Sequence, residues 1–381
     1  MGVTLSPRME KYLEDTKQFQ YDTLVELAQI PSPSHKEFRR AQWIKNYFDR
    51  YGGTDSYIDE ALNVVLPLNC EGCDEITVIT AHIDVVFPDE EPLPLVVKDG
   101  KMYCPGVGDD TANVVTLLQM ARYILENNLK PKKGLLIVTN SCEEGLGNLK
   151  GSRQIMEDYK GRIKEFISFD GTFGFLCNDA VGSHRYSVEV KTEGGHSFVD
   201  FGNRNAIAIL SSMISTLYDM KVPSGSKTTY NVGQIEGGTS INSIAQSAKM
   251  LFEYRSDSVE DMAVMEKFFR SVCDSYRNMG IEVNVEILGK RPCKDGVDEK
   301  ALAELTQRAV KISEAITGIK CNVGASSTDC NTPLSQGVPA VCFGLYQGRG
   351  EHTRGEWLEI DSLPIGSRIA AAFISDYFDN F

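Results

Sequence analysis

The stretch Ile76-Thr77-Val78-Ile79-Thr80-Ala81-His82-Ile83-Asp84 decides the fold, because a short apolar run ends in two side chains that can serve a metal site. Three further runs have the same form: Leu135–Thr139 before Glu143-Glu144, Glu165–Phe169 before Asp170, and Ala340–Leu345 before His352. Runs of this length, separated by helical stretches, are typical of buried parallel strands. Ligands bind at the carboxyl ends of the strands in an open α/β sheet. The sequence therefore predicts that these side chains converge on one crevice.

A fifth candidate ligand, Asp109, lies in the Gly-rich loop Pro105–Asp110, directly before an apolar helix. Asp is a common helix cap, but with two adjacent acids one can cap while the other binds a metal. A carboxylate has two oxygens and can bridge two cations, which suits a metal pair about 3.5–4 Å apart. Two histidines and several carboxylates in one crevice therefore predict a two-metal site.

The pair Glu143-Glu144 is suited to a division of roles. Consecutive side chains of an extended segment diverge, so one can bind a metal while its neighbour acts as a general base. His82 and Asp84 are two residues apart and point the same way on a strand, so one can bind while the other orients it. Each position alone has a simpler explanation, such as a solvated acidic loop or, for His352, a loop histidine.

The composition indicates a globular chain without affinity for polyanions. The 381 residues are 42% hydrophobic and carry a formal net charge of −14, which argues against nucleic acid and anionic membranes. No run approaches the roughly 20 apolar residues of a membrane span. The polar start and ten scattered cysteines favour a reduced, cytoplasmic location. Gly2 with Ser6 fits the loose myristoylation pattern, for which a chance match is the simpler explanation.

The pattern of the chain changes near His184. Tyr186, Val188 and Val190 alternate with polar residues, as in a half-solvated strand. The elements that follow have the order β-α-β-β-α-β, which is typical of a ferredoxin-like unit. We therefore predict a small α+β domain over residues 183–295, inserted into a larger catalytic metal-binding domain over residues 1–182 and 296–381.

Five segments in this order resemble the signature blocks of the co-catalytic zinc metallopeptidase family of peptidase T, carboxypeptidase G, the aminoacylases and succinyl-diaminopimelate desuccinylase. They are Ile79–Asp84, Gly106–Asp110, Cys142–Gly145, Phe169–Gly171 and Glu351–Thr353. The resemblance covers nearly the whole chain. It implies an α/β fold of the zinc exopeptidase type, with a mixed, mostly parallel sheet flanked by helices and an inserted ferredoxin-like lid and dimerisation domain.

The resemblance also implies two zinc ions per subunit, with manganese or cobalt as alternatives. The implied ligands are His82 and Asp170 for one ion, Glu144 and His352 for the other, and Asp109 as the bridge. Asp84 would orient His82, and Glu143 would be the general base.

The inserted domain carries three more positions that match the family. Gly194–Ser197 resembles a lid motif whose histidine, here His196, reaches across a dimer and stabilises the oxyanion in the partner's site. Gly237–Asn242 resembles the substrate loop, with Asn242 at its end, and Arg255 resembles a carboxylate-binding arginine. The alternatives are a strand-end histidine at position 196 and a surface salt bridge at Arg255.

The predicted function is hydrolysis of the amide bond of small peptides, as by a di- or tripeptidase or an aminopeptidase, through a bridging water activated by two zinc ions. Hydrolysis of N-acyl amino acids is the nearest alternative. A non-catalytic metal- or peptide-binding relative and a cysteine hydrolase built on Cys142, which would need a histidine partner, are alternatives of other classes. The expected partners are a small peptide or N-acyl amino acid substrate and a second copy of the chain, with neither nucleic acid nor membrane.

Overall fold

The computed structural model describes residues 4–381, so the candidate acylation site Gly2 lies outside the described residues. The chain folds as two compact units. The larger unit combines Met1–Ala180 with Gly296–Phe381, and the smaller unit is Val181–Asp295. Among residues 4–381, no helix has both the length and the apolar character needed to cross a bilayer.

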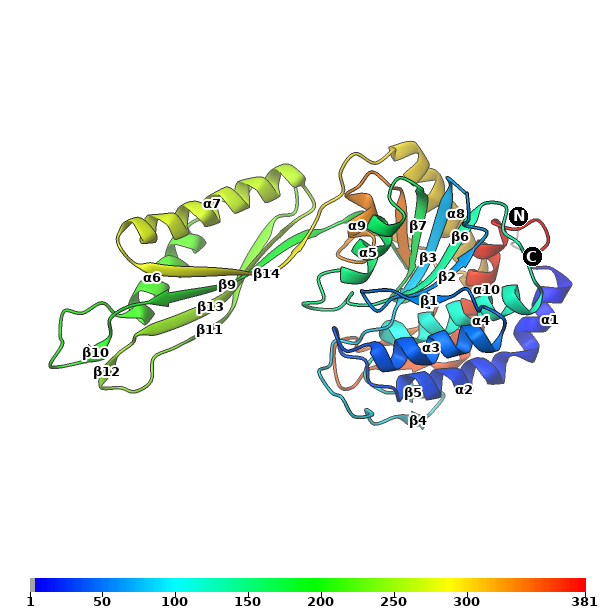
Figure 1. Ribbon diagram of the computed structural model, residues 1–381, viewed down its shortest axis with the longest axis horizontal. Helices are drawn as coiled ribbons and strands as arrows, with labels where there is room; N and C mark the ends of the chain where they lie inside the picture. Colours follow the sequence, from blue (N-terminus) through cyan, green and yellow to red (C-terminus); the bar gives the residue numbers. More distant parts are fainter. Residues whose placement is uncertain (1–3) are drawn as a thin grey trace. The chain divides into compact units, whose positions relative to one another are not determined.

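An eight-stranded mixed sheet forms the centre of the larger unit (Figure 1). Its strands, in spatial order, are β1 (Tyr57–Ile58), β2 (Val64–Leu68), β6 (Gly134–Asn140), β3 (Ile76–His82), β7 (Ile163–Phe169), β16 (Ala340–Phe343), β8 (Phe175–Ala180) and β15 (Asn322–Ser326). The central strands β6, β3, β7 and β16 run parallel, whereas β2 and β8 pair antiparallel with β6 and β16. Every residue of β3, β6 and β16 is buried, as expected of strands covered on both faces. The predicted mostly parallel sheet is confirmed.

Helices flank this sheet (Figure 1). They are α1 (Pro7–Asp15), α2 (Lys17–Ala28), α3 (Phe38–Arg50), α4 (Asn113–Glu126), α5 (Lys150–Asp158), α8 (Glu299–Thr317), α9 (Asn331–Leu334) and α10 (Leu363–Ser375), with the short turns η1 (Val107–Ala112) and η2 (Ile360–Ser362). Helix α4 packs on β3, β6 and β7, α8 packs on β8 and β16, and α10 contacts both helices. The long apolar face of α4 is what closes the core beneath the sheet.

The ends of the helices follow from local chemistry. The Asp298 carboxylate caps α8 by accepting from the backbone N–H of Lys300 at 2.9 Å, and α8 ends at Gly318, whose φ of +70° suits glycine. Helices α1 and α2 are separate because the chain leaves helical geometry at Thr16.

A second, smaller sheet of the larger unit consists of β17 (Gly348–Arg349), β18 (Trp357–Glu359), β5 (Lys101–Tyr103) and β4 (Val96–Lys98). Its strands are all antiparallel. The β17–β18 hairpin carries His352 in its loop, and β5 leads into the Gly-rich loop with Asp109. The pairing of β18 with β5 therefore joins two segments that are more than 200 residues apart in the sequence.

The smaller unit is a four-stranded antiparallel sheet of order β11-β13-β9-β14 with two helices. Its elements are β9 (Gly182–Lys191), β10 (Gly195–His196), α6 (Ala206–Tyr218), β11 (Thr229–Gly237), β12 (Ser243–Ile244), β13 (Ser247–Ser256), α7 (Val259–Asn278) and β14 (Glu282–Arg291). Burial alternates along β13, where Met250, Phe252 and Tyr254 form a core with α6 and α7. Helix α7 begins at the capping residue Ser258, which accepts from the N–H of Asp261.

Candidate metal centre

The candidate ligands lie where four parallel strands end. His82 is the last residue of β3, Asp170 follows β7 directly, and Glu144 follows β6 after a short turn. His352 comes after β16, in the β17–β18 loop, and Asp109 lies in η1 before α4. The structure brings all five together in the larger unit as two groups that could hold a cation.

The first group consists of His82, Asp109 and Asp170, each of which offers one ligand atom within 4.8 Å of the others. The Nε2 atom of His82 lies 3.1 Å from Oδ1 of Asp109 and 4.0 Å from Oδ1 of Asp170. One imidazole nitrogen and two carboxylate oxygens form a donor set that suits a divalent cation such as zinc.

The second group consists of Asp109, Glu144 and His352 under the same 4.8 Å limit. The Nε2 atom of His352 lies 3.2 Å from Oδ2 of Asp109 and 3.2 Å from Oε2 of Glu144. Asp109 therefore directs one carboxylate oxygen to each group. A carboxylate shared in this way is the arrangement that two neighbouring cations require.

The negative charges of this centre oppose one another. Burial raises the pKa of Glu144 to about 7 against the opposing effect of the His352 contact, and the charge of Asp109 raises it further. Burial also raises the pKa of Asp170 well above its ordinary value, with contributions from Asp109 and Glu143. Against the effect of burial, contacts with His352 and His82 instead hold the pKa of Asp109 below its ordinary value. Cations at the two groups would supply further positive charge to these crowded carboxylates.

The neighbouring carboxylates favour the protonated, charged form of both histidines. Burial alone would lower the pKa of His82, but the charge of Asp110 and the contact with Asp109 raise it well above its ordinary value. Contacts with Asp109 and Glu144 raise the pKa of His352 to about 11. A cation would have to displace these protons in order to bind the imidazole nitrogens.

Asp84 acts on more of the centre than its predicted role of orienting His82 suggests. The Nδ1 atom of His82 is 3.0 Å from the backbone carbonyl of Asp84 and 3.5 Å from its carboxylate Oδ1. The carboxylate instead accepts from the backbone N–H groups of Glu143 and Glu144, both at 2.9 Å, and from the Ser34 hydroxyl at 2.6 Å. Asp84 therefore fixes the Glu143-Glu144 turn together with the imidazole.

The side chain of Glu143 is buried at this turn, 7% exposed, next to the candidate ligand Glu144. Its charge contributes to the raised pKa of Asp170, Glu144 and Asp329. The charge of Glu143 thus affects one ligand in each group, which fits a general base beside the two candidate cation sites.

Three acidic residues of the centre were not predicted with a role. Glu356 accepts from the backbone N–H of Gly108 and of Asp109, both at 2.8 Å, and from that of Gly106. Asp110 accepts from the backbone N–H of His82 at 2.9 Å. The fully buried Asp329 accepts from the Asn140 side chain at 2.5 Å. The sequence gives no signal for Glu356 or Asp329, because their partners come from distant segments.

Cys142 has the histidine neighbour that a cysteine hydrolase would need. Its Sγ atom lies 3.4 Å from Nδ1 of His35 and 3.1 Å from Oε1 of Glu37. The thiol is fully buried, and burial and the charge of Glu37 raise its pKa far above the ordinary value. A nucleophilic cysteine needs an accessible thiol with a lowered pKa, so the geometry disfavours this alternative.

His196, Asn242 and Arg255 all belong to the smaller unit. The Nδ1 atom of His196 accepts from the backbone N–H groups of Phe198 and Val199 at 3.3 and 3.4 Å, which leaves Nε2 as the donor of an exposed ring. The carbonyl of Asn242 accepts from the N–H of Ser197 at 3.0 Å, so the two loops are tied together.

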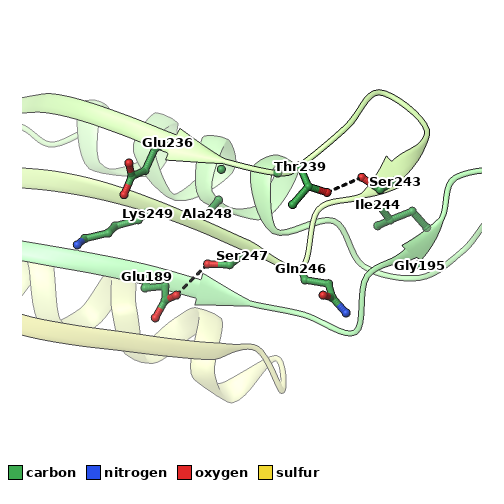
Figure 2. Close-up of a pocket in the computed structure, with 12 residues that line it drawn as sticks. Glu189, Gly195, Glu236, Thr239, Ser243, Ile244, Gln246, Ser247, Ala248 and Lys249 are labelled. Carbon is green, nitrogen blue, oxygen red and sulfur yellow. Dashed lines mark hydrogen bonds between the residues drawn. The ribbon is translucent and has the colours of Figure 1, made fainter.

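A hollow of about 670 Å³ lies beside these loops within the smaller unit (Figure 2). Glu189, Glu236 and Lys249 line one part of it, and Gly195 and Ser243 line the end near the β10–β12 pair. None of its lining residues belongs to either ligand group.

Arg255 already has a carboxylate partner. Its Nε and Nη2 atoms donate to the two oxygens of Glu253, both at 3.0 Å. A substrate carboxylate at Arg255 would therefore compete with Glu253, two residues away on the same strand.

Comparison with known proteins gives consistent results over most of the chain. A model of the Peptidase family M20/M25/M40 matches residues 78–376. The uncharacterized protein YqjE of Bacillus subtilis is 25% identical over 374 residues, which cover 93% of this chain and 97% of that protein. An acetylornithine deacetylase of Myxococcus xanthus is 24% identical over 298 residues, 75% of this chain and 76% of that one. The crystal structure of a tripeptidase from Staphylococcus aureus has a TM-score of 0.76 at 24% identity, covering 95% of this chain and 98% of that one.

The matched residues include every candidate ligand from His82 to His352 and the whole smaller unit. They make up well over half of the chain. The chain therefore belongs to the M20/M25/M40 peptidase family of metal-dependent hydrolases.

Proposed function

We propose that this protein hydrolyses the amide bond of small peptides at a centre of two divalent cations, with zinc as the metal. The observation that carries the proposal is the position of Asp109, whose two oxygens face two separate groups of ligand atoms. His82 and Asp170 would hold one cation, and Glu144 and His352 the other. Manganese and cobalt suit the same nitrogen and oxygen donors.

Two cations at these groups would polarise the scissile carbonyl and lower the pKa of the attacking water. The Glu143 carboxylate accepts a proton from that water while the water oxygen bonds to the carbonyl carbon. Glu143 then delivers the same proton to the amide nitrogen, the C–N bond breaks, and a carboxylic acid and an amine are released. Asp84 supports this role by holding the backbone N–H of Glu143.

The proposed substrate contacts come from the inserted domain, residues 183–295, acting as a lid and dimerisation domain. His196 would donate Nε2–H to the oxyanion in the partner's site of a homodimer. Asn242 would contact the substrate beside it, since its loop is bonded to Ser197. Arg255 would bind a substrate carboxylate after exchange with Glu253.

The proposed substrate class rests on the comparisons, and the proposed partners and location rest on the composition of the chain. The likeness to a tripeptidase supports a small peptide, and the similarity to an acetylornithine deacetylase favours N-acyl amino acids as the second candidate. Both substrates present an amide and a carboxylate. The net charge of −14 and the absence of a basic run argue against a nucleic-acid or membrane partner, and the ten scattered cysteines favour a cytoplasmic enzyme.

The substrate class can be tested with a panel of dipeptides, tripeptides and N-acetyl amino acids. We expect peptides to have the highest kcat/KM, and a chelator to abolish hydrolysis until Zn²⁺, Mn²⁺ or Co²⁺ is restored. Preference for the N-acetyl amino acids would select the deacylase. Binding of metal and peptide without any turnover would identify a non-catalytic relative.

The role of Glu143 can be separated from metal binding. We expect Glu143→Ala to lower kcat by at least about 10²–10⁴-fold, the contribution of a general base, with an unchanged metal content by atomic emission. Leu146→Ala, an exposed position in the same loop, should retain activity. Loss of metal from Glu143→Ala would make Glu143 a ligand rather than the base.

The raised pKa values predict how pH acts on stability. Glu144, Asp170, His82 and His352 all have a raised pKa in the folded protein without metal. Through these four groups folding takes up protons between the ordinary carboxylate pKa and about 11, so their contribution to the free energy of unfolding falls as pH rises through this range.

Scanning calorimetry can measure this effect. We expect the Tm of the chelated protein to fall between about pH 5 and about pH 8, and saturating Zn²⁺ to flatten the fall because the cation replaces the protons. Glu144→Gln, which cannot ionise, should reduce the slope of the chelated protein. A Tm that rises over this interval in the chelator would contradict the assignment.

Donation of a hydrogen bond by His196 to the partner's site can be tested by complementation. His196→Ala should lower kcat by about 10²–10³-fold, the cost of one oxyanion donor. A mixture of His196→Ala and Glu143→Ala chains should regain about a quarter of the wild-type activity, because half of randomly assembled dimers hold one complete site. A mixture that stays inactive while heterodimers form would exclude donation across a dimer.

A further inference from the structure

We propose that Glu37 is a positioning residue for the turn that carries Glu143 and Glu144, and that it acts as a hydrogen-bond acceptor rather than as a charge. This inference rests on the proposed function of the metal centre. Glu37 is fully buried and stands directly before α3, more than 100 residues away from the turn in sequence.

Glu37 contacts the turn through one oxygen, Oε1. Oε1 accepts from the backbone N–H of Cys142 at 3.1 Å, from the Cys142 thiol at 3.1 Å, and from the backbone N–H of His35 at 2.9 Å. Oε2 is buried and has no hydrogen-bond partner among residues 4–381. An uncharged acceptor in the position of Oε1 therefore satisfies the same donors.

The turn needs such a partner because its backbone is strained. Cys142 has a φ of +57°, and His35, which Glu37 also holds, has a φ of +71°. A left-handed conformation is costly for residues other than glycine and persists only where surrounding contacts impose it. Oε1 contacts both residues, alongside the hydrogen bond from the N–H of Leu149 to the carbonyl of Cys142.

Glu37 and Asp84 together bind three consecutive backbone N–H groups. Glu37 takes that of Cys142, and the two oxygens of Asp84 take those of Glu143 and Glu144. The orientation of the Glu144 carboxylate therefore depends on a carboxylate at the start of α3 as well as on the end of β3.

The dependence is unequal between the two ligand groups. Glu144 belongs to the group with Asp109 and His352, whereas the group of His82, Asp109 and Asp170 takes no ligand from this turn. Displacement of the turn should weaken one cation site and leave the other intact. A general loss of stability would act on both.

The test uses Co²⁺ alone, titrated into the metal-free full-length protein and followed by visible absorption. Glu37→Asp keeps the charge but withdraws the oxygen, whereas Glu37→Gln keeps the oxygen and its reach but removes the charge. We expect Glu37→Asp to weaken one of the two Co²⁺ equivalents by about 10–100-fold, the scale for residues that orient metal ligands. Glu37→Gln should bind both equivalents with affinities close to those of the wild type.

Two controls identify the affected site. Glu144→Ala should remove the same equivalent that Glu37→Asp weakens. Leu13→Ala, which removes buried volume from α1, should lower the Tm while it binds both equivalents normally.

Each outcome decides between the alternatives. Wild-type affinities in Glu37→Asp, equal weakening of both equivalents, or a weaker site in Glu37→Gln than in Glu37→Asp would overturn the positioning role. A wild-type protein that binds no Co²⁺ would overturn the proposed function, and the inference with it. A wild-type protein that binds two equivalents but hydrolyses no amide would refute only the activity and leave the affinities of the variants to decide the role of Glu37.

Discussion

The structure depends on how one carboxylate, that of Asp109, is held between two imidazoles. Its two oxygens lie 3.1 and 3.2 Å from the Nε2 atoms of His82 and His352. This geometry tolerates little displacement, because each oxygen must stay directed at its own group. The loop of Asp109 is fixed by Glu356, which accepts from three of its backbone N–H groups. The segments that carry the proposed metal ligands are thus held by buried carboxylates that accept from their backbone N–H groups. These carboxylates are Glu37, Asp84, Asp110 and Glu356.

The fold supplies this arrangement through its parallel strands. The carboxyl ends of four parallel strands, β6, β3, β7 and β16, lie on the same side of the larger unit. Beyond these ends the backbone groups are no longer paired within the sheet, and side chains accept their hydrogen bonds instead. The apolar strands cannot carry these charges in their interior, because burial without a partner is costly. The charges therefore collect at the strand ends, and the buried centre keeps their pKa values far from the ordinary ones.

The sequence was sufficient to predict the central strands, the order of elements in the smaller unit, and the side chains that converge. Each follows from a local pattern: an apolar run with a polar end, a period of two along β9, or a period of 3.6 along α4. The contacts of Glu356, Asp329 and Glu37 could not be predicted, because each depends on the approach of segments more than 100 residues apart.

The β17–β18 hairpin has a consequence for the biosynthesis of the protein. Its loop carries both His352 and Glu356, which reach back to a loop that was synthesised about 250 residues earlier. A nascent chain that has emerged only as far as Asp170 holds a single complete ligand group. The second group closes when almost the entire polypeptide has left the ribosome, so a truncated translation product cannot assemble the paired centre.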